Sequence, residues 1–191
     1  MNILQESIAS LGDAYDFANM TAAQIQAAIA EVAIYWASQV TDIEAIIRAI
    51  EFAYAIGASP DDVFAALGYE DDGITGFGPW ASPTDRTGLG RDVQDALNAQ
   101  QDYGFHEMWQ PDVEEEQIHH LIFWMQVAYY NFTPWASVGN WAHELCNNPA
   151  CSPEDEALGV WAIQVGDMLA NGEISLLDLA NLMRASLIYG N

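Results

Sequence analysis

Apolar residues recur along the chain at the three- and four-residue intervals of helices that bury one face. Ile25, Ile29, Val32 and Trp36 follow these intervals. The next segment repeats them at Ile43, Ile46, Ile47, Ile50 and Tyr54. The sequence shows no sustained alternation of apolar and polar residues between hairpin turns, which is the pattern of strands. The pattern therefore predicts an all-α fold, an irregular bundle of about eight or nine helices.

Helix-start signals support this prediction. At five places a serine or threonine is followed three residues later by an acid or amide, which is the capping-box pattern. The pairs are Thr21–Gln24, Thr41–Glu44, Ser59–Asp62, Ser152–Asp155 and Ser175–Asp178. Glycines stand where the helices are expected to end in left-handed backbone, at Gly57, Gly68, Gly172 and Gly190.

Residues 68–90 interrupt the helical pattern and predict a long irregular loop. The segment holds six glycines, two prolines and three consecutive acids. Long loops are commonly functional or linking. The loop is therefore a candidate binding surface, although its two aromatic residues could instead pin it to the core. The candidate binding residues are Glu70, Asp71, Asp72, Phe77 and Trp80.

The loop also suggests how the chain is organised. We expect an N-terminal helical part at 1–67 and a C-terminal helical part at 91–191, packed as one globular unit. The piece GASPDDVFAALGY is similar to helix–turn–helix segments of many phage and large secreted bacterial proteins. It is too short to identify a family.

Charge narrows the possible functions more than any motif does. The 191 residues include 28 acids, four arginines and no lysine, and the net charge is −24. Direct binding to nucleic acid needs several cations on phosphates, so we expect none. An anionic membrane surface is disfavoured for the same reason, and Schiff-base or P-loop chemistry lacks its lysine. A basic protein partner, divalent cations or plain solubility remain.

No membrane or export signal is expected from the sequence. Its first residues lack a basic region before an apolar core, which a signal peptide would show. The longest apolar stretch, LIFWMQVAYY, is interrupted by Gln126 and is shorter than the roughly 20 residues of a membrane helix. We expect a soluble protein, either cytoplasmic or released by a route without a signal peptide.

The stretch EEEQIHH suggests either a charged helix start or a metal site. Asp112 can cap a helix over 113–131, whose first turn then places three acids near the positive end of the helix dipole. His119 and His120 lie four residues after two of these acids. Glu-x-x-His is half of a di-iron motif, but no second copy exists, because Asn140 precedes His143 by three residues. We therefore favour the helix start and count Glu114, Glu115 and Glu116 as candidate binding residues.

A second candidate metal site is HELCNNPAC. Zinc could be held by His143, Cys146 and Cys151, with His106, His119 or His120 completing the set. The alternative is a disulfide or two buried thiols.

Glu144 in the same stretch is the candidate catalytic residue. It lies close to Trp141, and a carboxyl against tryptophan can have a raised pKa and act as a general acid. A solvated surface glutamate is the plainer alternative.

Residues 167–178 resemble an incomplete calcium loop. Asp167, Asn171, Gly172 and Asp178 fall at loop positions, but Leu169 stands where an oxygen ligand is needed. A helix end at Gly172 followed by a new helix at Ser175 would explain the same residues.

Three functional hypotheses follow. The first is a non-enzymatic acidic interaction module that docks on a basic partner, as a nucleic-acid mimic, an inhibitor, or a phage or assembly subunit. The second is a small helical hydrolase or metalloenzyme that uses Glu144 or the histidines. The third is an exported or virion helical domain whose acidity serves only solubility. The first hypothesis adds the acids after Pro153 to the candidate binding residues, Glu154, Asp155 and Glu156.

Overall fold

The computed structural model describes six parts of the chain, residues 3–12, 15–68, 88–99, 104–109, 117–130 and 153–190. In these parts the protein is all-helical, with eight α-helices and no strand, which confirms the predicted fold class. Among the described helices, none combines the length and apolar character that a membrane span requires.

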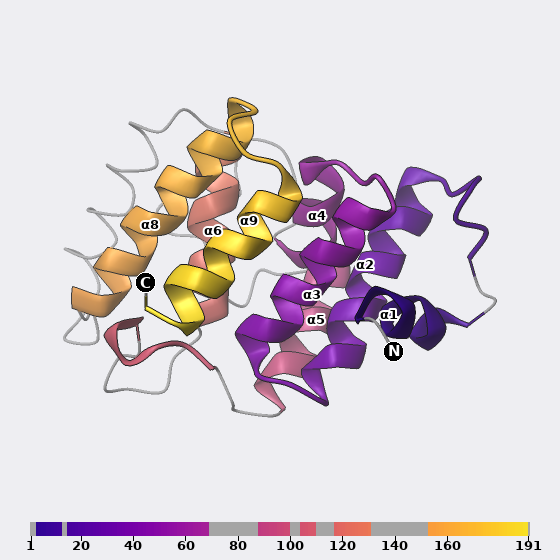
Figure 1. Cartoon of the computed structure of the whole chain (residues 1–191), viewed down its shortest axis with the longest axis horizontal. Coiled ribbons are helices and arrows are strands. Elements are labelled where there is room, and N and C mark those ends of the chain that lie inside the picture. Colours follow the sequence, from indigo (N-terminus) through magenta and orange to yellow (C-terminus); the bar gives the residue numbers. More distant parts are fainter. Residues whose placement is uncertain are drawn as a thin grey trace.

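The helices form two groups that lie side by side (Figure 1). In the first group, α2 packs against each of the other helices. Its members are α1 (Ile3–Leu11), α2 (Ala22–Ala37), α3 (Asp42–Ala55), α4 (Pro60–Leu67) and α5 (Gly88–Asn98). The second group consists of α6 (Gln117–Tyr130), α8 (Pro153–Ala170) and α9 (Leu176–Met183). The groups join mainly where α9 packs against α3.

The apolar intervals identify most of the core of the first group, although Ile25 is only partly buried. Ile29, Val32 and Trp36 are buried, as are the four isoleucines of α3. Tyr54 continues the same interval but is 47% exposed, because it lies in the last turn of α3. The interval predicts the face of a helix, while burial at its end depends on what packs there.

Three of the predicted capping boxes are present, at Thr21, Ser59 and Ser175. Thr41 is the N-cap of α3, as predicted, but its side chain makes no capping hydrogen bond, so the predicted capping box is absent there. Its expected partner, Glu44, binds two arginines instead. Ser152 lies outside the described residues.

The glycine predictions divide in the same way. Gly57, Gly172 and Gly190 adopt the expected positive φ, at 76°, 68° and 67°. Gly68 does not, since its φ is −96°. A Cβ at Gly68 would lie 2.7 Å from the backbone carbonyl oxygen of Phe64 and would displace the end of the Gln126 side chain, so the space at this helix end favours glycine.

Helices α6 and α8 pack more closely than side chains of ordinary size allow. A Cβ at Gly166 of α8 would overlap the carbonyl oxygen of Met125 and lie 3.0 Å from Cβ of Ala128. α6 is buried on most of its surface, including Leu121 and Ile122. Gly166 therefore fixes the distance between these two helices.

The C-terminal end departs from one continuous helix. α9 ends at Met183 and continues as a π-helical turn, η3 (Arg184–Ile188). The segment 104–109, which contains the 3₁₀ turn η2 (Glu107–Trp109), lies against this turn. Helix α5 begins at Gly88, inside the range predicted as loop.

Candidate functional site

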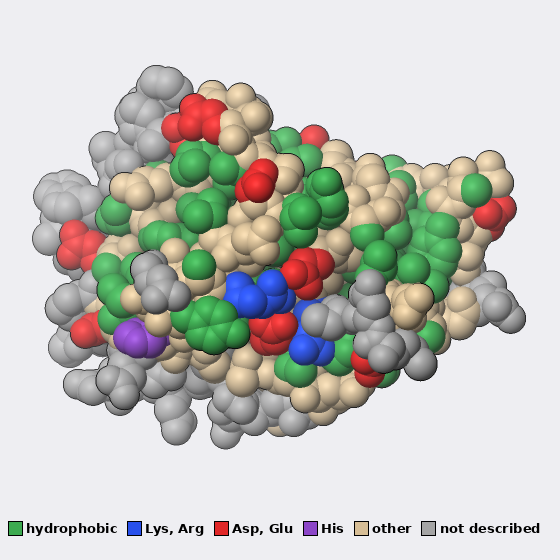
Figure 2. All heavy atoms as spheres, in the orientation of Figure 1, with side chains coloured by type: hydrophobic (Ala, Val, Ile, Leu, Met, Phe, Trp, Pro, Cys, Tyr) green, Lys and Arg blue, Asp and Glu red, His purple; other side chains and the backbone are tan. Residues whose placement is uncertain are grey.

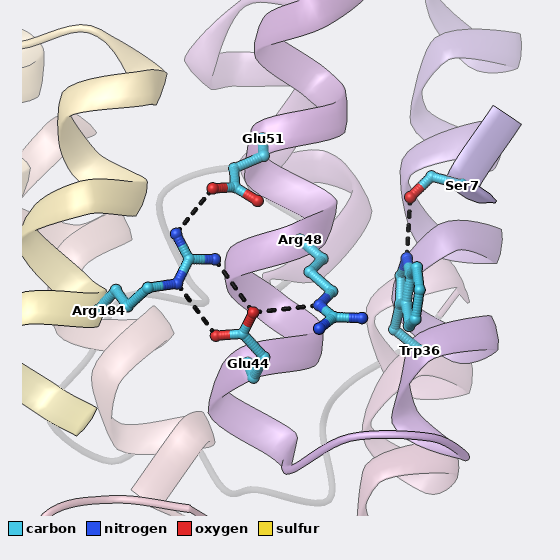
Figure 3. A network of polar contacts seen from close by, with 6 residues as sticks. All are labelled: Ser7, Trp36, Glu44, Arg48, Glu51 and Arg184. Carbon is cyan, nitrogen blue, oxygen red and sulfur yellow. Dashed lines mark hydrogen bonds and ion pairs between the residues drawn. The ribbon is translucent and has the colours of Figure 1, made fainter. Parts of the chain in front are cut away.

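Two of the four arginines are held in an ion-pair network on α3 (Figure 3). Glu44 accepts from Nε of Arg48 at 3.1 Å and from both Nε and Nη2 of Arg184, at 3.2 and 3.1 Å. Nη1 of Arg184 donates to Glu51 at 2.8 Å. The network thus joins the start of η3 to two residues of α3 that lie about two helical turns apart.

The environment of Arg184 favours its charged form. Burial alone would lower the pKa of this guanidinium, but the hydrogen bonds and negative charges of Glu51 and Glu44 outweigh it and raise the pKa above its usual value. The side chains are partly shielded from water, with 23% of Arg184 and 17% of Glu44 exposed. Arg184 therefore stays positively charged at any ordinary pH.

The network extends to the first two helices through Arg48. Its guanidinium carbon lies 4.0 Å from the ring centre of Trp36, a cation–π contact. The indole N–H of Trp36 donates to the buried hydroxyl of Ser7 at 2.8 Å. A continuous set of polar contacts thus connects α1, α2, α3 and η3.

The network is electrically neutral, so the other residues account for the net charge of the protein. Two acids and two arginines cancel inside the network, so the remaining residues carry the whole net charge of −24. Arg91 is exposed on α5, and Arg86 lies outside the described residues. Figure 2 shows the described acids on one face as separate spots, with two of them next to the arginines at its centre.

Many of the described acids accept hydrogen bonds within the fold. Asp62 and Asp178 complete capping boxes. Glu31 accepts from the hydroxyl of Tyr15, and burial together with this hydrogen bond and charge raises the pKa of Tyr15 to about 12. Burial also raises the pKa of Tyr129, and the charge and hydrogen bond of Asp61 raise it further. These contacts show that part of the acidity serves structure.

The three candidate binding acids of α8 lie in its first turn. Glu156 is exposed, while Glu154 and Asp155 are half-buried. Asp155 accepts from the side-chain amide of Gln117 and so links α8 to α6. The other candidate binding residues lie outside the described residues: Glu70, Asp71, Asp72, Phe77, Trp80, Glu114, Glu115 and Glu116.

The structure describes the candidate metal ligands only in part. His120 lies half-buried on α6, with its ring 6.2 Å from that of Trp124. His119 is also on α6, and its side chain is not among those described. The proposed zinc ligands and the candidate catalytic residue lie outside the described residues: His143, Cys146, Cys151 and Glu144. Within the described ranges, no three His, Cys, Asp or Glu side chains are grouped to hold a metal ion.

The residues of the calcium-like loop form a helix end and a helix start. The amide of Asn171 donates to the carbonyl of Asp167, as at the last turn of a helix. The carboxylate of Asp178 accepts from the amide and the hydroxyl of Ser175 at 2.9 and 2.6 Å. This geometry matches the structural alternative that the sequence left open.

Sequence reasoning missed the network around Glu44. The spacing of Glu44, Arg48 and Glu51 on one helix face was a usable signal, because residues four apart on a helix are neighbours. Nothing in the sequence pairs Arg184 with residues 140 and 133 positions earlier.

No family model matches this chain, and no curated protein or solved structure matches it either.

Proposed function

We propose that this protein is a non-enzymatic interaction module that docks on a basic protein partner. The observation that carries the proposal is that two arginines are neutralised inside the fold, while the excess of acids remains on the other residues. Arg48 and Arg184 are neutralised by Glu44 and Glu51, and the net charge of −24 belongs to the other residues. A surface with a large excess of one sign of charge attracts partners of the opposite sign and speeds their encounter.

The dispersed acids of Figure 2 favour docking by overall charge over nucleic-acid mimicry on that face. A mimic needs carboxylates that follow one another as phosphates do along a strand. The acids that this face shows are separate, and several acids in the described part of the chain accept hydrogen bonds within the fold. Acidity that serves only solubility is the alternative that the experiment must reject.

The test is retention of basic proteins on the immobilised chain, with poly-L-glutamate of matched charge density as the control matrix. The proposal expects a basic protein from the native source that the chain retains and poly-glutamate does not. Rising salt should release it, because exposed charges are screened over about 10 Å at 0.1 M ionic strength. Retention of the same proteins by both matrices would mean that the acidity serves solubility.

A further inference from the structure

Three aromatic rings meet where α4 packs against the end of α6. The ring centre of Phe64 lies 5.1 Å from that of Tyr129 and 6.0 Å from that of Tyr130. The centres of the two tyrosine rings are 4.9 Å apart. Phe64 is buried, whereas Tyr129 is half-buried and Tyr130 is 43% exposed. The two tyrosines therefore form an aromatic surface on top of a buried ring.

An acid lies beside this surface. Asp61 is exposed and precedes Phe64 by three residues on α4, so the two side chains share one face of the helix. Burial, the charge of Asp61 and a hydrogen bond between this carboxylate and the hydroxyl of Tyr129 raise the pKa of that tyrosine. The next acid, Asp62, is used within the fold, because it accepts from the amide and the hydroxyl of Ser59. Asp61 is therefore the carboxylate that this surface offers to a ligand.

The same combination of groups already binds an arginine inside the protein. Arg48 donates from Nε to the carboxylate of Glu44 at 3.1 Å, and its guanidinium carbon lies 4.0 Å from the ring centre of Trp36. A guanidinium makes both contacts at once because it is planar and carries five N–H donors. Asp61 and the tyrosine rings present a carboxylate and an aromatic ring together at the surface.

We propose that Asp61, Tyr129 and Tyr130, together called the tyrosine patch, bind an arginine side chain of the basic partner. This inference rests on the proposed function, and it names the recognised residue of the partner and the place where it binds. A carboxylate has about four acceptor positions, so Asp61 has room for a guanidinium besides the hydroxyl of Tyr129. The exposed ring of Tyr130 supplies the surface on which the guanidinium stacks.

The local chemistry selects arginine over other occupants. Lysine carries a compact, strongly hydrated charge, which stacks less well on a ring and lacks the planar fork that fits a carboxylate. An apolar side chain would cover the charge of Asp61 without giving it a partner, which costs free energy. Overall charge then attracts the partner, and the tyrosine patch recognises one type of side chain in it.

The experiment compares three synthetic peptides of equal length, with equal numbers of arginines, lysines or leucines between glycines and serines. Binding of each peptide to the full chain is measured by calorimetry at low salt. We expect the arginine peptide to bind roughly fivefold more tightly than the lysine peptide, as one cation–π contact at an exposed site allows. The leucine peptide should bind more weakly than both.

Two double variants locate this preference. Asp61→Asn, Tyr130→Leu should abolish the preference for arginine, while asparagine keeps the shape of the acid and leucine keeps an apolar cover over Phe64. The single variant Tyr130→Phe keeps the ring and should keep the preference. The matched control is Asp16→Asn, Tyr54→Leu, which removes an exposed acid and a tyrosine that is 47% exposed outside the patch. It should keep the fivefold preference, and melting curves check that each variant is folded.

Each contrary outcome has its own meaning. Equal affinity of the parent for the arginine and lysine peptides would reject the tyrosine patch and leave docking by overall charge in place. Tightest binding of the leucine peptide, or a dimer that sedimentation detects in the parent and not in Asp61→Asn, Tyr130→Leu, would reject arginine as the occupant. Loss of the preference in both double variants would place it outside the patch. If neither cationic peptide binds at low salt, the proposed function fails as well.

Discussion

The contact between α6 and α8 and the contact between α3 and α9 hold their helices together in opposite ways. The first is close and mainly apolar, with Gly166 against the backbone of Met125. The second is charged, with Arg184 at the end of α9 bound to Glu44 and Glu51. In the first contact the distance between helices is fixed by the absence of a side chain, and in the second it is fixed by ion-pair geometry.

The difference shows where this protein uses its few cations. Apolar packing is non-directional, so it holds two helices together without selecting one pairing of groups. Arginine binds carboxylates at defined angles and distances, so a misplaced α9 would lose these bonds. The chain has four arginines and places two of them in the network between α3 and the end of α9. This contact therefore has a single arrangement.

The largest effect is expected from Gly166→Val. The added side chain would overlap the carbonyl of Met125 and force α6 and α8 apart. We expect the free energy of unfolding, measured with urea, to fall by on the order of 3 kcal/mol. The control is Ala170→Val at an exposed position of the same helix. Equal losses in both variants would show that close packing at Gly166 does not matter.

Arg184→Met should have the next largest effect. The substitution keeps the length of the side chain but leaves Glu44 and Glu51, which are partly shielded, without the cation that binds both. The free energy of unfolding should fall by about 1–3 kcal/mol. Arg91→Met, at an exposed position of α5, is the matched control and should change it by less than about 0.5 kcal/mol. A similar loss in the two variants would show that the ion pairs of Arg184 stabilise the fold no more than an exposed arginine does.

Ser7→Ala tests whether the network reaches α1. Without the hydroxyl, the indole N–H of Trp36 loses its buried acceptor. The expected loss in thermal or urea stability is about 1–2 kcal/mol. Ser38→Ala, which removes an exposed hydroxyl, should cost less. If the two substitutions cost the same, the network ends at Trp36.

Ser175→Ala should have the smallest effect, because it changes neither the close contact at Gly166 nor the ion pairs of Arg184. Removal of the capping hydroxyl at α9 should cost about 1 kcal/mol at neutral pH. The hydrogen bonds from the hydroxyl and amide of Ser175 lower the pKa of Asp178 below its usual value. A carboxyl whose pKa is lower in the folded state contributes stability above its unfolded pKa and loses it as pH falls through the folded value. The difference between parent and variant should therefore shrink in acid, and a difference independent of pH would contradict this.

Local sequence patterns predicted much of the fold because helix starts and buried faces depend on near neighbours. Ser59 and Ser175 needed only the residue three positions later. At Thr41 the helix begins as predicted but the capping box is absent, and Glu44 binds Arg48 and Arg184 instead. The site is harder to predict for the same reason. Composition gave the charge, but only the fold shows that Arg184 of η3 binds Glu44 and Glu51 of α3.

The double use of Glu44 has a consequence for how the chain is made. Helix α3 leaves the ribosome long before Arg184 is synthesised, since 140 positions separate Glu44 from its second arginine. During that interval Glu44 can pair only with nearby groups, such as Arg48 four residues later or the amide of Thr41. Arg184 can bind Glu44 only after α9 has been made, so a later segment of the chain completes the packing of α3.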